Sequence, residues 1–138
     1  MIVVDTNLLV QLHVQGRQTT EAEAVLQRDP AWVAPLLWRS EFRNTLLGFV
    51  RHGMMTFEVA LRVIHKAERW MTGREYGVVS HHVLHLAVES GCSAYDCEFV
   101  CLAQDLGTSL ITSDRQVLRT FPALARTPAQ FLAGSRHS

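Results

Sequence analysis

The sequence has no excess of charge of either sign and almost no lysine. Its 138 residues include thirteen acidic and thirteen basic side chains, and Lys66 is the single lysine beside twelve arginines. A chain without net charge has no overall basic field to attract nucleic acid, so any such binding must use a local patch or metal ions. The preference for arginine suits planar recognition of phosphate or carboxylate groups.

Long hydrophobic runs and paired cysteines are also missing. No apolar run approaches the length of a membrane-spanning helix, and Asp5 interrupts the first one, so we expect neither a membrane anchor nor a secretory signal. Three cysteines without such a signal predict reduced thiols in the cytoplasm. The content of 48% hydrophobic and 19% charged residues is typical of a globular chain and not of a disordered one.

Short strand patterns alternate with helical patterns along the whole chain. Strands are expected over residues 2–4, 32–34, 76–79 and 109–112, with an edge strand over 124–127; helices are expected over 6–15, 20–27, 35–52, 56–71, 80–90, 96–106 and 115–120. Such alternation predicts an α/β fold, in which a mostly parallel sheet of four or five strands lies between two helix layers. We expect one three-layer α/β/α domain over residues 1–133 and a flexible C-terminal tail over 134–138.

Two acidic side chains directly follow buried strand patterns. Asp5 ends the first strand, and Asp114 follows the strand over 109–112. In an open parallel sheet, ligands bind beyond the carboxyl ends of the strands. Asp96, at the start of the helix that precedes the later strand, can face the same edge. The pattern therefore indicates carboxylates that converge on one point.

Glu41 is a further acid, inside the helix that follows the second strand. It lies about two turns after Pro35, from where a glutamate can reach the carboxyl edge of the sheet. On local pattern alone, the favoured interpretation is a solvated helix glutamate paired with Arg43 or Arg39. Both interpretations stay open at this point.

Four short segments carry these acids in order along the chain. They are Val-Val-Asp-Thr-Asn at residues 3–7, Glu41 after Ala34-Pro35, Ala-Tyr-Asp at residues 94–96, and Leu-Ile-Thr-Ser-Asp-Arg at residues 110–115. Together they resemble the PIN-domain family, in particular the VapC-type ribonuclease toxins of bacterial toxin–antitoxin pairs. The resemblance spans nearly the whole chain, and it implies that Asp5, Glu41, Asp96 and Asp114 are the acidic quartet that binds metal. It also places Asn7 and Thr112 where that family often has supporting polar groups.

The resemblance implies a Mg2+- or Mn2+-dependent endoribonuclease that hydrolyses single-stranded or looped RNA as the toxin of a toxin–antitoxin pair. The residue types suit this chemistry, because hard cations prefer oxygen ligands and a divalent ion relieves repulsion among close carboxylates. Asp5 and Asp96 would be the principal ligands, with Glu41 and Asp114 bound directly or through water. The implied partners are RNA, a second copy of the chain in a homodimer, and a small antitoxin whose tail approaches the acidic pocket.

Two other functions are compatible with acids at a sheet edge. A receiver-like phosphoacceptor domain uses a lysine after a late strand, but Lys66 lies within the helix over 56–71. A non-catalytic PIN-like module that only binds a protein partner would not need four carboxylates, whose mutual repulsion costs stability. The ribonuclease is therefore the preferred interpretation, and the non-catalytic module is the alternative.

Glu98 and Arg115 adjoin the quartet in the sequence. Glu98 is either a fifth acid near the site or a first-turn residue favoured by the helix dipole. Arg115 either contacts a phosphate of the substrate or pairs with an acid.

Histidines and cysteines also occur at helical spacing. His81 and His85 have a zinc-like spacing, but no neighbouring Cys or carboxylate completes a site, so capping and surface contacts are favoured. Cys97 and Cys101 stand where the PIN family often has small residues such as alanine. They are interpreted as buried small residues.

The helices expected over 35–52 and 56–71 carry more apolar surface than a small domain need bury. The residues concerned are Leu46, Leu47, Phe49, Val50, Met54, Met55 and Phe57. Exposed apolar patches of this kind usually mark an interface. By the resemblance, one part would form the homodimer and another would accept the antitoxin.

Overall fold

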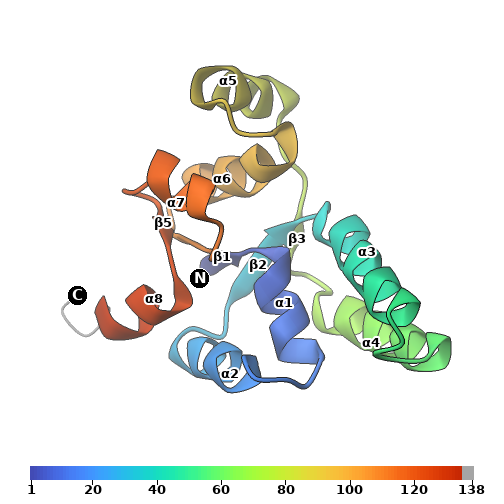
Figure 1. Ribbon diagram of the computed structural model, residues 1–138. Coiled ribbons are helices and arrows are strands. Elements are labelled where there is room, and N and C mark those ends of the chain that lie inside the picture. Colours follow the sequence, from blue (N-terminus) through green and yellow to red (C-terminus); the bar gives the residue numbers. More distant parts are fainter. Residues whose placement is uncertain (135–138) are drawn as a thin grey trace.

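The computed structural model describes residues 1–134 of the chain, which contain five strands and eight helices (Figure 1). The strands are β1 (Ile2–Val4), β2 (Trp32–Pro35), β3 (Glu75–Tyr76), β4 (Leu110–Ile111) and β5 (Ala125–Arg126). The helices are α1 (Thr6–His13), α2 (Thr19–Arg28), α3 (Trp38–Arg51), α4 (Phe57–Trp70), α5 (Ser80–Ser90), α6 (Ala94–Leu106), α7 (Arg115–Thr120) and α8 (Pro128–Gly134).

The sheet is parallel throughout, with the strand order β3-β2-β1-β4-β5. The chain builds outward from β1 to β3 on one side and then crosses back to place β4 on the other side of β1. The strand order therefore reverses between β1 and β4, where Val4 pairs with Ile111. Side chains just beyond these two strands face the crevice in which open parallel sheets bind ligands.

Helices cover both faces of the sheet, which confirms the expected three-layer α/β/α architecture (Figure 1). Helix α6 packs on one face against β1, β2 and β4, and α5 lies on the outer side of α6. Helices α1 and α2 lie on the other face, with α8 against α2 and the α3–α4 pair against α1. Because α6 is covered on both sides, its middle turns are buried and apolar around the whole helix. None of the described helices is long and apolar enough to cross a membrane.

Several element boundaries differ from the sequence-based expectations. Pro35 does not open a helix: it ends β2, because the Leu36 N–H still donates to the carbonyl of Tyr76 in β3 at 3.2 Å. Asp96 lies inside the first turn of α6, because the Ser93 side chain caps that helix by accepting from the Asp96 N–H.

The chain end also differs from the expectation. Helix α8 was not predicted, and it forms where Phe131 is buried and the helix packs on α2. Gly134, the first residue of the expected tail, ends α8. The rest of that tail, residues 135–138, lies outside the described part of the chain.

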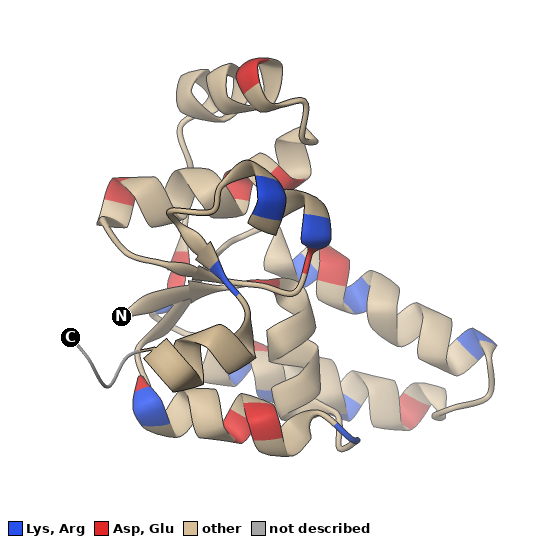
Figure 2. Cartoon of the chain, turned by 60° about the vertical axis from the view of Figure 1, so that its left-hand side comes forward, with Lys and Arg blue, Asp and Glu red and all other residues tan. Residues whose placement is uncertain are grey.

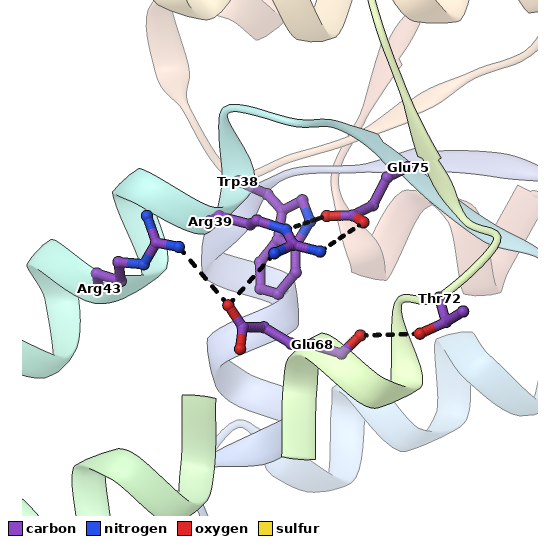
Figure 3. Close-up of polar contacts among 6 residues, drawn as sticks. All are labelled: Trp38, Arg39, Arg43, Glu68, Thr72 and Glu75. Carbon is purple, nitrogen blue, oxygen red and sulfur yellow. Dashed lines mark hydrogen bonds and ion pairs between the residues drawn. The ribbon is translucent and has the colours of Figure 1, made fainter. Parts of the chain in front are cut away.

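A polar network joins α3, α4 and the edge strand β3 (Figure 3). The Arg39 guanidinium donates to both carboxylate oxygens of Glu75, at 2.6 and 2.9 Å, and the buried Trp38 indole N–H donates to Glu75 at 2.7 Å. The hydrogen bonds from Arg39 hold the pKa of Glu75 below its ordinary value. Arg39 and Arg43 also reach Glu68 on α4, at 3.5 and 3.6 Å. Both arginines are therefore engaged with carboxylates of other elements.

Candidate active site

A cavity of about 470 Å³ opens at the carboxyl ends of β1 and β4. Asp5, Glu41, Asp96 and Asp114 all line it, although they come from separate elements. The other polar lining residues are Thr6, Asn7, Ser40, Asn44, Thr45, Tyr95 and Thr112. Among the described residues that line the cavity there is no Lys, Arg or His. The cavity is thus acidic and has no basic partner in its wall.

Asp5 and Asp114 are tied to each other through Thr112. The Thr112 hydroxyl donates to Asp5 Oδ2 at 2.7 Å and accepts from the Asp114 N–H at 3.0 Å. Each aspartate also caps the helix that follows it, Asp5 by accepting from the Leu8 N–H and Asp114 by accepting from the Val117 N–H. Burial nevertheless raises the pKa of Asp5, and these hydrogen bonds offset that effect only in part.

Glu41 points into the same cavity from α3. Its carboxylate accepts a 2.6 Å hydrogen bond from the Thr6 hydroxyl at the start of α1. Burial raises the pKa of Glu41, and the charges of Asp96 and Asp5 raise it further. Neither Arg39 nor Arg43 forms an ion pair with Glu41. Arg39 pairs with Glu75 and Glu68, and Arg43 pairs with Glu68. The expectation of a solvated glutamate paired on its own helix was therefore wrong.

The carboxylates act on one another around the cavity. The pKa of Asp96 is raised first by burial and then by the charge of Asp114. Asp114 also raises the pKa of Asp5, and Asp96 and Asp5 raise that of Glu41. The four groups thus form a closed ring of repelling pairs, and such a ring favours a bound cation or proton.

The donor set of this cavity suits a hard divalent cation. All four carboxylates offer oxygen, which Mg2+ and Mn2+ prefer, and no thiol or imidazole lines the wall. Within residues 1–134, one group of three His, Cys, Asp or Glu side chains has ligand atoms within 4.8 Å of one another. This group is His82, Cys101 and Asp105, and it lies outside the cavity. The acids are therefore spaced more widely, which suits Mg2+, because that ion usually keeps several of its waters.

The other expected site residues divide into two groups. Asn7 and Thr112 line the cavity, whereas Glu98 and Arg115 are not part of its wall. Glu98 still lies near enough for its charge to raise the pKa of Glu41. Arg115 is exposed at the start of α7, directly after Asp114.

Thr6 is one of the cavity residues that the sequence analysis did not assign, and the one that binds a carboxylate of the quartet. Its side chain is only 5% exposed, and its hydroxyl orients Glu41, which is 35 residues away in the chain. The available signal was its position: a hydroxyl directly after an acid that ends a buried strand must lie at the carboxyl edge.

Solved structures share this fold. The chain superposes on the crystal structure of PAE2754 from Pyrobaculum aerophilum with a TM-score of 0.76 and 21% identity, covering 99% of this chain and 90% of that one. It superposes on a toxin–antitoxin complex from Klebsiella pneumoniae with a TM-score of 0.68 and 19% identity, covering 93% and 98%. At such identities these likenesses show the fold alone.

The comparison of sequences adds a relative, although no protein-family model matches the chain. The chain is 27% identical over 126 residues to Ribonuclease VapC3 of Pyrobaculum aerophilum, covering 89% of this chain and 96% of that protein. The chain is therefore similar to a VapC-type ribonuclease over most of its length. In the view of Figure 2, basic and acidic positions are both scattered over the helices and do not gather on one face.

Proposed function

We propose that the chain is a metal-dependent endoribonuclease and the toxin of a toxin–antitoxin pair. The observation that carries this proposal is that Asp5, Glu41, Asp96 and Asp114 line one cavity without a basic residue in its wall. Similarity to Ribonuclease VapC3 supports the activity on RNA. Likeness in fold to a toxin–antitoxin complex supports a protein partner.

Asp5 and Asp96 would hold Mg2+ or Mn2+ as principal ligands, with Glu41 and Asp114 bound directly or through water. When bound, the cation polarises the phosphodiester and lowers the pKa of a water molecule in the cavity. The hydroxyls of Thr112 and Thr6 position Asp5 and Glu41 by donating to their carboxylates. Carboxylates held in this way lose little further freedom when a ligand binds.

Substrate contacts would lie at the mouth of the cavity. Asn7 is exposed and lines the wall, so its amide can bond a phosphate or ribose group. Arg115 is exposed beside Asp114 and would contact an RNA phosphate. With zero formal net charge, the chain would depend on the cation and such local groups to bind RNA.

A cleavage assay on mixed-sequence RNA oligonucleotides tests the activity. We expect cleavage with Mg2+ or Mn2+, products with 5′-phosphate and 3′-hydroxyl ends, and no cleavage in excess chelator. A non-catalytic PIN-like module would leave the RNA intact with either metal. Cleavage that persists in excess chelator would contradict the role proposed for the carboxylates.

An apolar groove between α3 and α4 is the proposed antitoxin site. It is a hollow of about 210 Å³ lined by Arg43, Leu46, Leu47, Val50, Phe57, Ala60, Leu61 and Ile64. Phe57 is 62% and Leu47 is 42% exposed, whereas Leu46 is buried and belongs to the core, contrary to the expectation. A groove of this kind suits the apolar face of an amphipathic helix, which the antitoxin would supply.

Phe57→Asp should weaken binding of the cognate antitoxin at least about tenfold, because a charge would replace an aromatic anchor at the groove. RNA cleavage by the free chain should stay unchanged, since Phe57 does not line the acidic cavity. Titration of the small protein encoded beside the chain, followed by calorimetry, measures the affinity. Met54→Asp is the matched control: Met54 is 70% exposed but does not line the groove, so antitoxin affinity should be retained.

We also propose that the chain forms a homodimer. Helix α5 exposes Leu84 and Val88, which are four residues apart, and Val79 directly before the helix is also exposed. These apolar side chains do not line the groove and are proposed as the dimer contact. Sedimentation at high micromolar concentration should show a dimer, and a chain that stays monomeric there would contradict the proposal.

A further inference from the structure

Three residues with different ligand atoms meet where α5 packs on the outer side of α6. His82 Nδ1 lies 3.1 Å from Cys101 Sγ and 3.0 Å from Asp105 Oδ1, and Cys101 Sγ lies 3.6 Å from Asp105 Oδ2. Ligand atoms of all three lie within 4.8 Å of one another. The cluster is separate from the acidic cavity, because none of its members lines that wall.

We propose that His82, Cys101 and Asp105 form a binding site for a borderline-soft divalent cation of the Zn2+ type. Imidazole nitrogen, thiolate sulfur and carboxylate oxygen are the three ligand types that zinc accepts, and three protein ligands leave a fourth position for water. The thiolate distinguishes this site from the all-oxygen cavity, since Mg2+ does not prefer sulfur.

The hydrogen bonding around His82 supports a site that is already formed. Its Nε2 lies 2.8 Å from the amide oxygen of Gln104, a geometry in which Nε2–H donates. In a neutral ring of this tautomer the lone pair is on Nδ1, 3.0 Å from Asp105 Oδ1, where a cation or a proton between the two atoms relieves their repulsion. Ligating histidines commonly donate their other N–H to an acceptor in this way, which sets the tautomer and the ring orientation.

The burial of the cluster gives it a closed side and an open side. Cys101 is fully buried, whereas the side chains of His82 and Asp105 are 30% and 45% exposed, so an ion can enter from solvent. Burial and the charge of Asp105 raise the pKa of the Cys101 thiol to about 11, which argues against a reactive thiolate in the metal-free chain. A bound cation would displace the thiol proton to solvent.

The cation would join two helices that share a small apolar cluster of their own. Val83, Cys92, Cys97 and Cys101 form this cluster beneath α5, separate from the main core. Helix α5 lies on the far side of α6 from the sheet in Figure 1, and α6 packs between them. An ion held by α5 through His82 and by α6 through Cys101 and Asp105 would therefore fasten α5 to the domain.

The sequence analysis considered zinc at a different pair of histidines. His81 and His85 line a neighbouring hollow of about 370 Å³, but neither belongs to the cluster of ligand atoms. Cys101 is 19 residues from His82 along the chain, and only the packing of α5 on α6 brings them together.

Titration of the untagged, metal-free chain with Co2+ tests the site, because a thiolate ligand gives a near-ultraviolet sulfur-to-cobalt charge-transfer band. We expect saturation of the band at one equivalent of Co2+ and its loss when Zn2+ is added. Cys101→Ser should abolish the band, whereas Cys97→Ser should retain it. Cys97 is the matched control, since it is a buried cysteine one turn earlier on the same helix.

Two variants at the exposed side keep the test independent of core packing. Loss of a hydrogen-bond partner of a ligand typically weakens metal affinity roughly 10–100-fold, and Gln104→Ala should weaken the apparent Co2+ affinity by this amount. Asp105→Asn removes a ligand itself and should weaken that affinity further. Zn2+ should raise the melting temperature of the wild type and leave that of Asp105→Asn almost unchanged.

The acidic cavity is itself proposed to bind a divalent metal, so the titration is repeated in an Asp96→Asn chain. The band and its stoichiometry should stay the same there, which shows that the thiolate site is independent of the proposed ribonuclease centre. A wild type without the band, a band that survives Cys101→Ser, or an unchanged Co2+ affinity in Asp105→Asn would each overturn the proposal.

Discussion

Asp96→Asn should lower the rate of RNA cleavage about a thousandfold or more. The amide keeps the size and hydrogen-bonding capacity of the side chain but removes one negative charge from the ring of carboxylates in the cavity. That charge would face the cation, so its loss should act on metal binding and on the transition state together. Single-turnover cleavage of an RNA oligonucleotide at saturating Mg2+ measures the effect.

The carboxylates should also act as one unit. Asp5→Asn should have an effect as large as Asp96→Asn, and the double variant should lose little more, because each change alone already disables the site. Glu23→Gln on α2 is the control, since Glu23 is exposed and does not line the cavity. A folded Asp96→Asn chain that cleaves RNA at a rate close to that of the wild type would refute the proposed role.

Asp96→Asn should lower activity but raise the thermal stability of the metal-free chain. Burial and the Asp114 charge raise the folded-state pKa of Asp96 above its ordinary value of 3.8. A raised folded-state pKa means that Asp96 does not lower the free energy of unfolding at pH values below its unfolded-state pKa. Its ionisation lowers that free energy as the pH rises through the folded-state pKa. At neutral pH, metal-free Asp96→Asn should therefore melt above the wild type, and the difference should vanish below about pH 3.8.

Added Mg2+ should reverse this order. A ligand that binds only the folded state stabilises it by about 2.7 kcal/mol at a hundred times its dissociation constant, and the variant should gain almost none of this. Thermal unfolding followed by circular dichroism, with chelator or with Mg2+, measures both effects, and Glu23→Gln should follow the wild type in each. Equal stabilisation of Asp96→Asn and the wild type by Mg2+ would show that Asp96 is not a ligand.

The positions of Asp5 and Asp114 could be predicted because they depend on local pattern. Each follows a short buried strand and precedes a helix, and the alternation of strands and helices implies a parallel sheet whose carboxyl ends share one edge. The strand bounds were less accurate: the strand expected over 76–79 is observed at Glu75–Tyr76. Strand ends depend on hydrogen bonds to neighbours that a single sequence does not reveal.

The environment of Glu41 shows why side-chain partners are harder to predict. Local spacing paired it with Arg39 or Arg43, which lie on the same helix. Arg39 instead binds Glu75, 36 residues away, and Glu41 accepts from Thr6, 35 residues away. Partners this distant depend on how the elements pack, and a helical pattern holds no information about that packing.

By itself, the sequence determined the fold class and the acids that follow β1 and β4, because backbone propensity and hydrophobic period act over a few residues. Only the tertiary structure decided that Glu41 faces the cavity, that Thr6 and Thr112 hold the carboxylates, and that His82 meets Cys101 and Asp105. These contacts join residues 19 to 107 positions apart. Their geometry depends on the crossover that places β4 beside β1 and on the packing of α5 against α6, which the burial of apolar surface drives without regard to sequence distance.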